Sequence, residues 1–236
     1  MKGKLVISLA LSLIVGGACW VRAELAAQTG RPMDIREFVR QTFIQGIPYE
    51  EASRYDSSGV PALLEMLADP KEEPYWPNIV VTLGIIGDER AVDPLIALVN
   101  KDAPGTLSNS QYTARTSALM ALGYLVNKSK NAKALAYLKE NLDPQVWAKR
   151  KITWTSPYQA SVEERNVQLS KAAILGLALC GDPSAAEALR KLQQPAETEA
   201  AKRFQAQTSN VVAEALSVNE IIAKEGLAAY YRKAKR

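Results

Sequence analysis

The chain has 236 residues, a formal net charge of +4, and hydrophobic and charged fractions of 47% and 23%, which is an ordinary balance for one or two folded domains. It contains no histidine, and this excludes catalytic triads built on histidine and every histidine-ligated metal site. The many alanines and leucines favour helix, so the composition predicts a mostly helical scaffold.

The first 23 residues, 1–23, have the layout of a secretory signal peptide. A basic start precedes an uncharged apolar run at residues 5–18, and small residues then mark a cleavage site after Ala23. We therefore expect an exported protein, either periplasmic or secreted. Two alternatives stay open: the apolar run is retained as a membrane anchor, or Cys19 carries a lipid, because the residues before it loosely resemble a bacterial lipoprotein box.

Loss of this segment leaves a nearly neutral chain. Three of the 29 basic residues and none of the 25 acidic residues lie in it, so the remaining charge gives no electrostatic support for a nucleic-acid partner. One cysteine remains, Cys180, and the apolar sequence around it favours a small core residue over a reactive thiol.

Residues 24–57 are predicted to form an N-terminal helical cap. Residues 35–43 have a helical pattern, and residues 49–55 can form a short second helix. The second helix is polar enough to shield the first repeat from water.

Residues 58–216 repeat one helical pattern. Four segments carry the i, i+3, i+4, i+7 apolar stripe of an amphipathic helix, in one case thinned. We call them the A helices: residues 60–67, 92–99, 135–142 and 185–192. The helices between them are apolar on more than one face, and we call them the B helices. They carry Leu83-Gly84, Leu122-Gly123 and Leu175-Gly176, and residues 213–216 can open a degenerate fourth copy.

The connections between these helices differ in a regular way. Each B helix leads into the next A helix over a nearly constant length, and Gly-Asp at 87–88 and 181–182 is predicted to end one helix and cap the next. The loops from A helices to B helices grow along the chain. Repeats that accept insertions at only one point have one packed rim and one free rim.

Residues 83–99, LGIIGDERAVDPLIALV, resemble a HEAT repeat of the short subclass named after phycobilin (PBS) lyases, whose pattern is A-L-G-x-x-G-D-x-R-A-V-x-P-L-I-x-x-L. The resemblance implies an all-α solenoid, a right-handed superhelix of about four to five HEAT-like helix pairs, with an unrelated all-α bundle as the alternative. The lyase activity is not implied, because the matching residues are helix-packing and turn residues. Residues 217–236 are expected to form a C-terminal capping helix that begins at Asn219.

The longest insertion, residues 143–162, is the predicted functional surface. It combines aromatic and basic residues of the kinds enriched at binding hot spots. The alternative is that its two tryptophans pin a long loop onto the solenoid. Loop 101–110 and the turn around residue 76 are expected on the same rim. The predicted partner-binding residues are Trp76, Trp147, Lys149, Arg150, Trp154 and Tyr158.

We therefore predict an exported, non-enzymatic scaffold that binds a protein partner, with no catalytic residue, metal or cofactor. Its B helices would present a concave face, with contacts such as Thr113, Thr116 and Lys171. The alternatives are an enzyme or enzyme subunit, acting on a bilin or a cell-envelope polymer, and a membrane-tethered assembly factor. An enzyme would need a deep pocket with converging polar groups near residues 143–162.

Overall fold

The computed structural model describes residues 32–44, 46–150, 152–158 and 160–234. The predicted signal segment, with Ala23 and Cys19, lies outside these residues. Contacts between α-carbons divide the chain into Met1–Asp34 and Ile35–Arg236, and the fold described below is that of the second unit. Within the described part of the chain, no helix is both long and apolar enough to cross a membrane.

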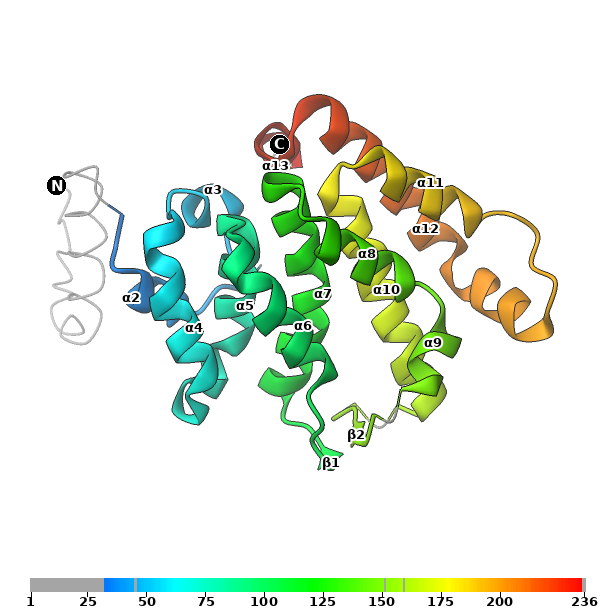
Figure 1. Cartoon of the computed structure of the whole chain (residues 1–236), viewed down its shortest axis with the longest axis horizontal. Helices are drawn as coiled ribbons and strands as arrows, with labels where there is room; N and C mark the ends of the chain where they lie inside the picture. The colour runs from blue at the N-terminus through cyan, green and yellow to red at the C-terminus, as the bar shows by residue number, and fades with distance from the viewer. Residues whose placement is uncertain (1–31, 45, 151, 159, 235–236) are drawn as a thin grey trace, which may run out of the picture. The chain divides into compact units, whose positions relative to one another are not determined.

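The second unit is a series of helix pairs (Figure 1), as predicted for a helical repeat. Its A helices are α4 (Val60–Ala68), α6 (Val92–Asn100), α8 (Ala132–Glu140) and α11 (Pro183–Lys191). Its B helices are α5 (Trp76–Ile86), α7 (Asn109–Ser129), α10 (Val162–Cys180) and α12 (Glu199–Glu225). The smaller elements are α2 (Ile35–Val39), α3 (Tyr49–Ala52), α9 (Pro144–Lys149), α13 (Leu227–Ala234), the 3-10 turns η1 (Ser57–Gly59), η2 (Pro70–Tyr75) and η3 (Glu89–Ala91), and the two-residue strands β1 (Gly105–Thr106) and β2 (Trp154–Thr155).

The B helices pack directly on one another in chain order, and glycines allow a very close approach. A Cβ atom on Gly84 would lie 2.5 Å from the Ala121 carbonyl oxygen, and one on Gly123 would overlap the carbonyl oxygen of Gly176. Because these contacts are made by backbone, no side chain can move aside to relieve them. The B helices therefore form a tight layer, whereas α4 and α6 of the A layer barely approach each other.

The glycine that ends a B helix and the aspartate that caps the next A helix are confirmed at both predicted places. Gly87 and Gly181 adopt left-handed φ values of 73° and 55°. The Asp88 carboxylate accepts a hydrogen bond of 2.9 Å from the Arg90 N–H, and the Asp182 carboxylate accepts one of 2.8 Å from the N–H of Ser184. These local signals place α6 and α11 at a fixed distance along the chain from the B helix before each.

The sequence pattern aligns Leu175 with Leu83, but the two are not equivalent in the structure: Leu83 is fully buried, whereas 37% of Leu175 is exposed. Gly87 follows Gly84 by three residues, but Gly181 follows Gly176 by five. Two extra residues rotate a helix by about 200°, which turns Leu175 outward. Leu177 is fully buried instead, four residues before the terminal glycine, as Leu83 is in α5.

The expected helix ends also need correction. The helices predicted at residues 35–43 and 49–55 are shorter and end at Val39 and Ala52. Asn219 does not begin a helix: it lies within α12, is buried, and donates a hydrogen bond of 2.7 Å to the Leu177 carbonyl oxygen. Packing against α10 carries α12 past the expected boundary at residue 217.

A tyrosine cluster joins the last helix to the first part of the unit. Gly226, with φ of 82°, separates α12 from α13, and α13 lies against α3. The Tyr231 ring stacks on Tyr49 with 4.7 Å between ring centroids, and its hydroxyl is hydrogen-bonded to that of Tyr124 in α7. Burial raises the pKa of all three phenols above the ordinary value.

Cys180 is buried at the end of α10, as predicted for a core residue. Burial raises the pKa of its thiol to about 11, so the thiol stays protonated near neutral pH.

Candidate functional site

A groove of about 470 Å³ separates the A helices α4 and α6. Its walls are aliphatic side chains and one proline; the lining residues are Leu64, Leu67, Ala68, Pro94, Ala97, Leu98, Asn100 and Lys101. Leu64 and Leu67 are half-buried, and Ala68 and Ala97 are exposed. Apolar surface is therefore open to solvent along the outer face of the first two repeats.

One end of the groove is polar. Asn100 closes α6, and Lys101 is the next residue; both are exposed. Among the described residues, no carboxylate pairs with the Lys101 ammonium group. The groove therefore combines apolar walls with a cationic end, an arrangement that can both bury a ligand and orient it.

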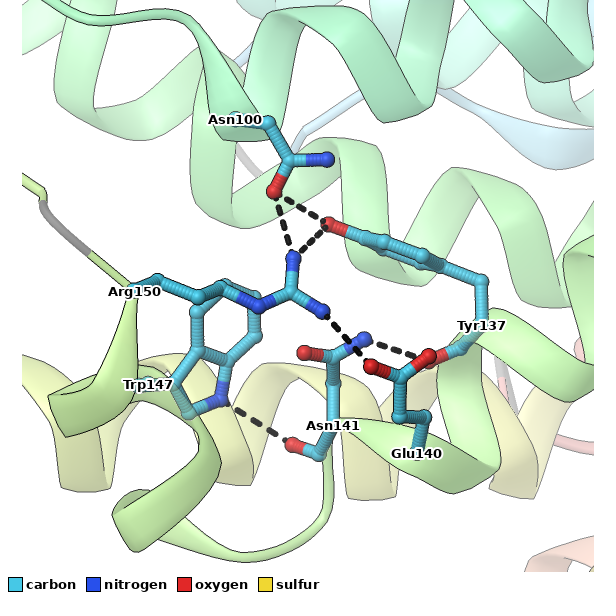
Figure 2. Close-up of polar contacts among 6 residues, drawn as sticks. All are labelled: Asn100, Tyr137, Glu140, Asn141, Trp147 and Arg150. Carbon is cyan, nitrogen blue, oxygen red and sulfur yellow. Dashed lines mark hydrogen bonds and ion pairs between the residues drawn. The ribbon is translucent and has the colours of Figure 1, made fainter.

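The neighbouring junction, between α6 and α8, is filled by side chains (Figure 2). Arg150, which follows α9, donates a hydrogen bond of 2.5 Å to the Asn100 side-chain oxygen and one of 3.2 Å to the Tyr137 hydroxyl. The Tyr137 hydroxyl also donates to Asn100 over 3.0 Å. The guanidinium group of Arg150 lies over the rings of Tyr137 and Trp147, with 5.3 and 4.9 Å to the ring centroids, and forms an ion pair of 3.3 Å with Glu140.

Helix α9 positions the side chains that fill the junction between α6 and α8. Pro144 occupies its first turn, and the Asp143 carboxylate caps it by accepting from the Gln145 N–H over 2.8 Å. The Trp147 side chain is fully buried, and its indole N–H donates to the Asn141 carbonyl oxygen over 3.0 Å (Figure 2). The insertion therefore supplies the side chains of Trp147 and Arg150, which fill the junction between α6 and α8; we call these two side chains the plug.

The second tryptophan of the insertion, Trp154, is also fully buried. Arg115 and Arg165 lie over its ring, with 5.3 and 5.2 Å to the centroid. The Arg165 guanidinium group donates to the Trp154 carbonyl oxygen over 2.6 Å, and Arg115 donates to that of Leu98 over 3.2 Å. Burial lowers the pKa of both arginines, and cation–π contacts and carbonyl oxygens offset part of their lost hydration.

These positions correct part of the predicted binding surface. Trp76, Trp147 and Trp154 are buried and cannot touch a partner in this structure, so the alternative of a pinned loop describes the insertion better. Arg150 is largely engaged within the fold. Lys149 is exposed, and Tyr158 is 62% exposed, so these two residues keep the accessibility that a partner contact needs.

The expected stacking of loops on one rim is confirmed. Strands β1 and β2 pair in parallel, with Gly105 opposite Trp154, and so join loop 101–110 to the insertion. The Glu73 carboxylate, in η2 next to Trp76, accepts hydrogen bonds from Ser108 over 2.6 Å and Gln111 over 2.7 Å. Both strands lie at the lower edge of Figure 1. A role of this rim in binding stays a prediction.

A second hollow, of about 330 Å³, lies between the start of α9 and the start of α12. It is lined in part by the insertion, which is where the alternative of an enzyme predicts an active site. Asp143 in its wall caps α9, however, and Lys191 forms an ion pair of 2.9 Å with Glu187. In the described part of the chain, no cluster of acidic, cysteine or histidine side chains is arranged to hold a metal ion. We therefore place the candidate site in the α4/α6 groove.

The sequence contains a signal for this groove that is easy to misread. Leu64 and Leu67 belong to the apolar stripe of the first A helix, and such a stripe normally indicates core. Periodicity shows which face of a helix is apolar, but not whether a neighbour covers it. The exposed Ala97 on the facing helix marks a place where no large side chain fills the gap.

A comparison with models of known protein families supports the assignment of helical repeats. The model of the family described as PBS lyase HEAT-like repeat matches residues 78–101, which run from α5 through η3 and α6. No curated protein and no solved structure matches the chain significantly. The matched residues include the second wall of the groove and end at Lys101.

Proposed function

From a chain that contains a PBS lyase HEAT-like repeat in an all-α helical-repeat fold, we propose a non-enzymatic scaffold that binds a segment of a partner protein in the α4/α6 groove. The observation that carries this proposal is the aliphatic groove itself, which stays open while the next junction along the same layer is filled. Helix pairs that present such grooves can bind a segment of another protein by burying its apolar side chains.

We also propose that the protein acts outside the cytoplasm. The basis is the layout of residues 1–23, with cleavage after Ala23. Sequencing the N-terminus of the protein purified from its cells tests this part. A chain that begins at Glu24 supports export with cleavage. A retained apolar segment or a lipid on Cys19 supports the membrane-tethered alternative, and a cytoplasmic chain with an intact N-terminus overturns the proposal of export.

The binding proposal is tested by comparing what the wild-type protein and two variants retain from the cell-envelope fraction. Ala97→Glu places a charge in the groove, whereas Ala136→Glu makes the same change at an exposed position of α8 outside it. Both substitutions keep a good helix former, so both variants should fold. We expect one protein to be retained by the wild type and by Ala136→Glu, and to be lost from Ala97→Glu. Equal retention by all three proteins would overturn the assignment of the groove.

A further inference from the structure

We propose that the α4/α6 groove binds a short protein segment that presents bulky aliphatic side chains followed by a carboxylate, with the carboxylate at Lys101. This inference rests on the proposed function and specifies the chemistry of the partner. It follows from three features of the groove: the composition of its walls, its direction and the charges at its end.

The composition of the walls favours a ligand with aliphatic side chains. Six of the lining residues offer no polar side-chain atom: Leu64, Leu67, Ala68, Pro94, Ala97 and Leu98. A polar side chain buried among them would lose its hydrogen bonds to water without replacement, whereas aliphatic side chains gain from burial. The walls thus select for the apolar part of a ligand and leave the polar recognition to the ends of the groove.

The groove has a direction. Both A helices start at the same rim, where Arg90 before α6 donates a hydrogen bond of 2.6 Å to the Ser57 carbonyl oxygen before α4. From Pro94 in α6 to Lys101, directly after this helix, the wall spans seven residue steps, or about 10 Å. A ligand of two helical turns or three to four extended residues matches this length. Its aliphatic side chains would lie toward Pro94 and its acidic group toward Lys101.

The charges at the polar end favour an anion. Lys101 is the one charged residue among those that line the groove. Of the carboxylates near this end, Glu140 forms an ion pair with Arg150, whereas Asp102 and Asp69 accept hydrogen bonds from uncharged donors, the Thr153 hydroxyl and the Lys71 backbone N–H (2.9 Å). At the far end, Asp93 pairs with Lys133 over 2.5 Å. The Lys101 ammonium group has no such partner among the described residues. A carboxylate on the ligand would pair with this ammonium group.

The test is a selection of displayed random 12-residue peptides on the immobilised protein, followed by affinity measurements with the selected peptides. Four variants are compared with the wild type: Ala97→Glu against its control Ala136→Glu, and Lys101→Glu against Lys224→Glu, which makes the same charge change at an exposed position of α12. Matching circular dichroism and thermal unfolding establish that each variant is folded.

We expect the wild type, Ala136→Glu and Lys224→Glu to select peptides with two aliphatic residues and an Asp or Glu. Ala97→Glu should select none of them. Lys101→Glu should bind the same peptides about 5- to 10-fold more weakly, since an exposed attraction becomes a repulsion, and should select Lys or Arg in place of the acid.

Different failures have different meanings. Groove-dependent peptides without an acid, or with an acid that Lys101→Glu does not affect, would overturn this inference and leave the proposed function standing. If no peptide is enriched, the proposal that the ligand is a linear protein segment is wrong. The same conclusion follows if dodecanoate binds at the groove while no peptide does. Peptides that bind Ala97→Glu as well as they bind the wild type would overturn the groove, and with it the proposed function.

Discussion

The two junctions that α6 makes within the A layer share a helix and a supporting B layer, yet one is open and the other is filled. Toward α4, the side chains leave a groove of about 470 Å³. Toward α8, Arg150 bridges Asn100 and Tyr137 and lies against Trp147 (Figure 2). The long insertion accounts for the difference, because it supplies both Trp147 and Arg150. The junction with the most aromatic and basic residues is thus the one whose residues are already used by the fold.

The largest expected effect comes from removing the plug of the filled junction. Trp147→Ala deletes a fully buried ring and its hydrogen bond to Asn141, and should lower the free energy of unfolding by about 3–5 kcal/mol. Urea denaturation measures this change. Trp147→Phe, as a control, keeps most of the apolar contact and should cost less. A loss below about 1 kcal/mol for Trp147→Ala would contradict the structural role of the ring.

A second change tests whether both junctions depend on the close B layer. Gly123→Ala places a methyl group against the Gly176 carbonyl oxygen, so α7 and α10 must move apart. We expect a net loss of about 2 kcal/mol in the free energy of unfolding, because overpacking outweighs the better helix propensity of alanine. Ser117→Ala, in the same helix, is the control and should change little. Stabilisation by Gly123→Ala would show that the layer is looser than described.

Removing only the charge from the filled junction should have a smaller effect. Arg150→Met keeps an unbranched apolar stem but loses the hydrogen bonds to Asn100 and Tyr137. The free energy of unfolding should fall by about 1 kcal/mol, since the guanidinium group is partly exposed to water. Lys149→Met, which changes the exposed neighbour, should have no measurable effect. Equal values for the two variants would mean that the bridge contributes nothing.

The filled junction should also respond to alkaline pH through Tyr137. Burial raises the pKa of its phenol above the ordinary value of 10.0, so the folded state holds the proton more tightly than the unfolded state. This contribution to stability is complete below pH 10 and decreases as the pH rises through the folded-state pKa. Wild-type stability should therefore fall more steeply above pH 10 than that of Tyr137→Phe. Parallel stability curves would contradict this assignment.

The smallest expected change in stability comes from filling the open junction. Ala97→Leu adds apolar volume at an exposed wall of the groove, so the free energy of unfolding should change by less than about 1 kcal/mol. Binding of a partner segment should nevertheless be lost, because the added side chain occupies its place. Ala136→Leu is the matched control. Binding that survives in Ala97→Leu would show that the groove is not the binding surface.

Local signals in the sequence were sufficient for much of the fold. The turns at Gly87-Asp88 and Gly181-Asp182 were predicted correctly, because a left-handed glycine and a capping carboxylate act within a few residues of chain. The outward position of Leu175 was missed, because it depends on the number of residues between two glycines rather than on the motif itself.

The site was harder to predict, because exposure depends on the whole fold. The sequence around Trp147 and Trp154 fits both a binding loop and a pinned loop, and only packing distinguishes the two. Leu64 and Leu67 belong to the apolar stripe of an A helix, which normally indicates core, yet they line the groove. The roles of Lys149 and Tyr158 in binding, and the presentation of Thr113, Thr116 and Lys171 on a concave face, stay predictions.

The tyrosines between α3, α7 and α13 bear on how the molecule unfolds. In most solenoids each repeat touches only its neighbours, so the array can unzip from either end. Here Tyr231 contacts Tyr49 and Tyr124, and the Tyr124 and Tyr231 hydroxyls are joined across 107 positions of the chain. Fraying of the last helix must therefore break contacts with α3, before the first repeat, and with α7. These contacts link the two ends of the array. We therefore expect its repeats to unfold in one cooperative transition instead of one after another.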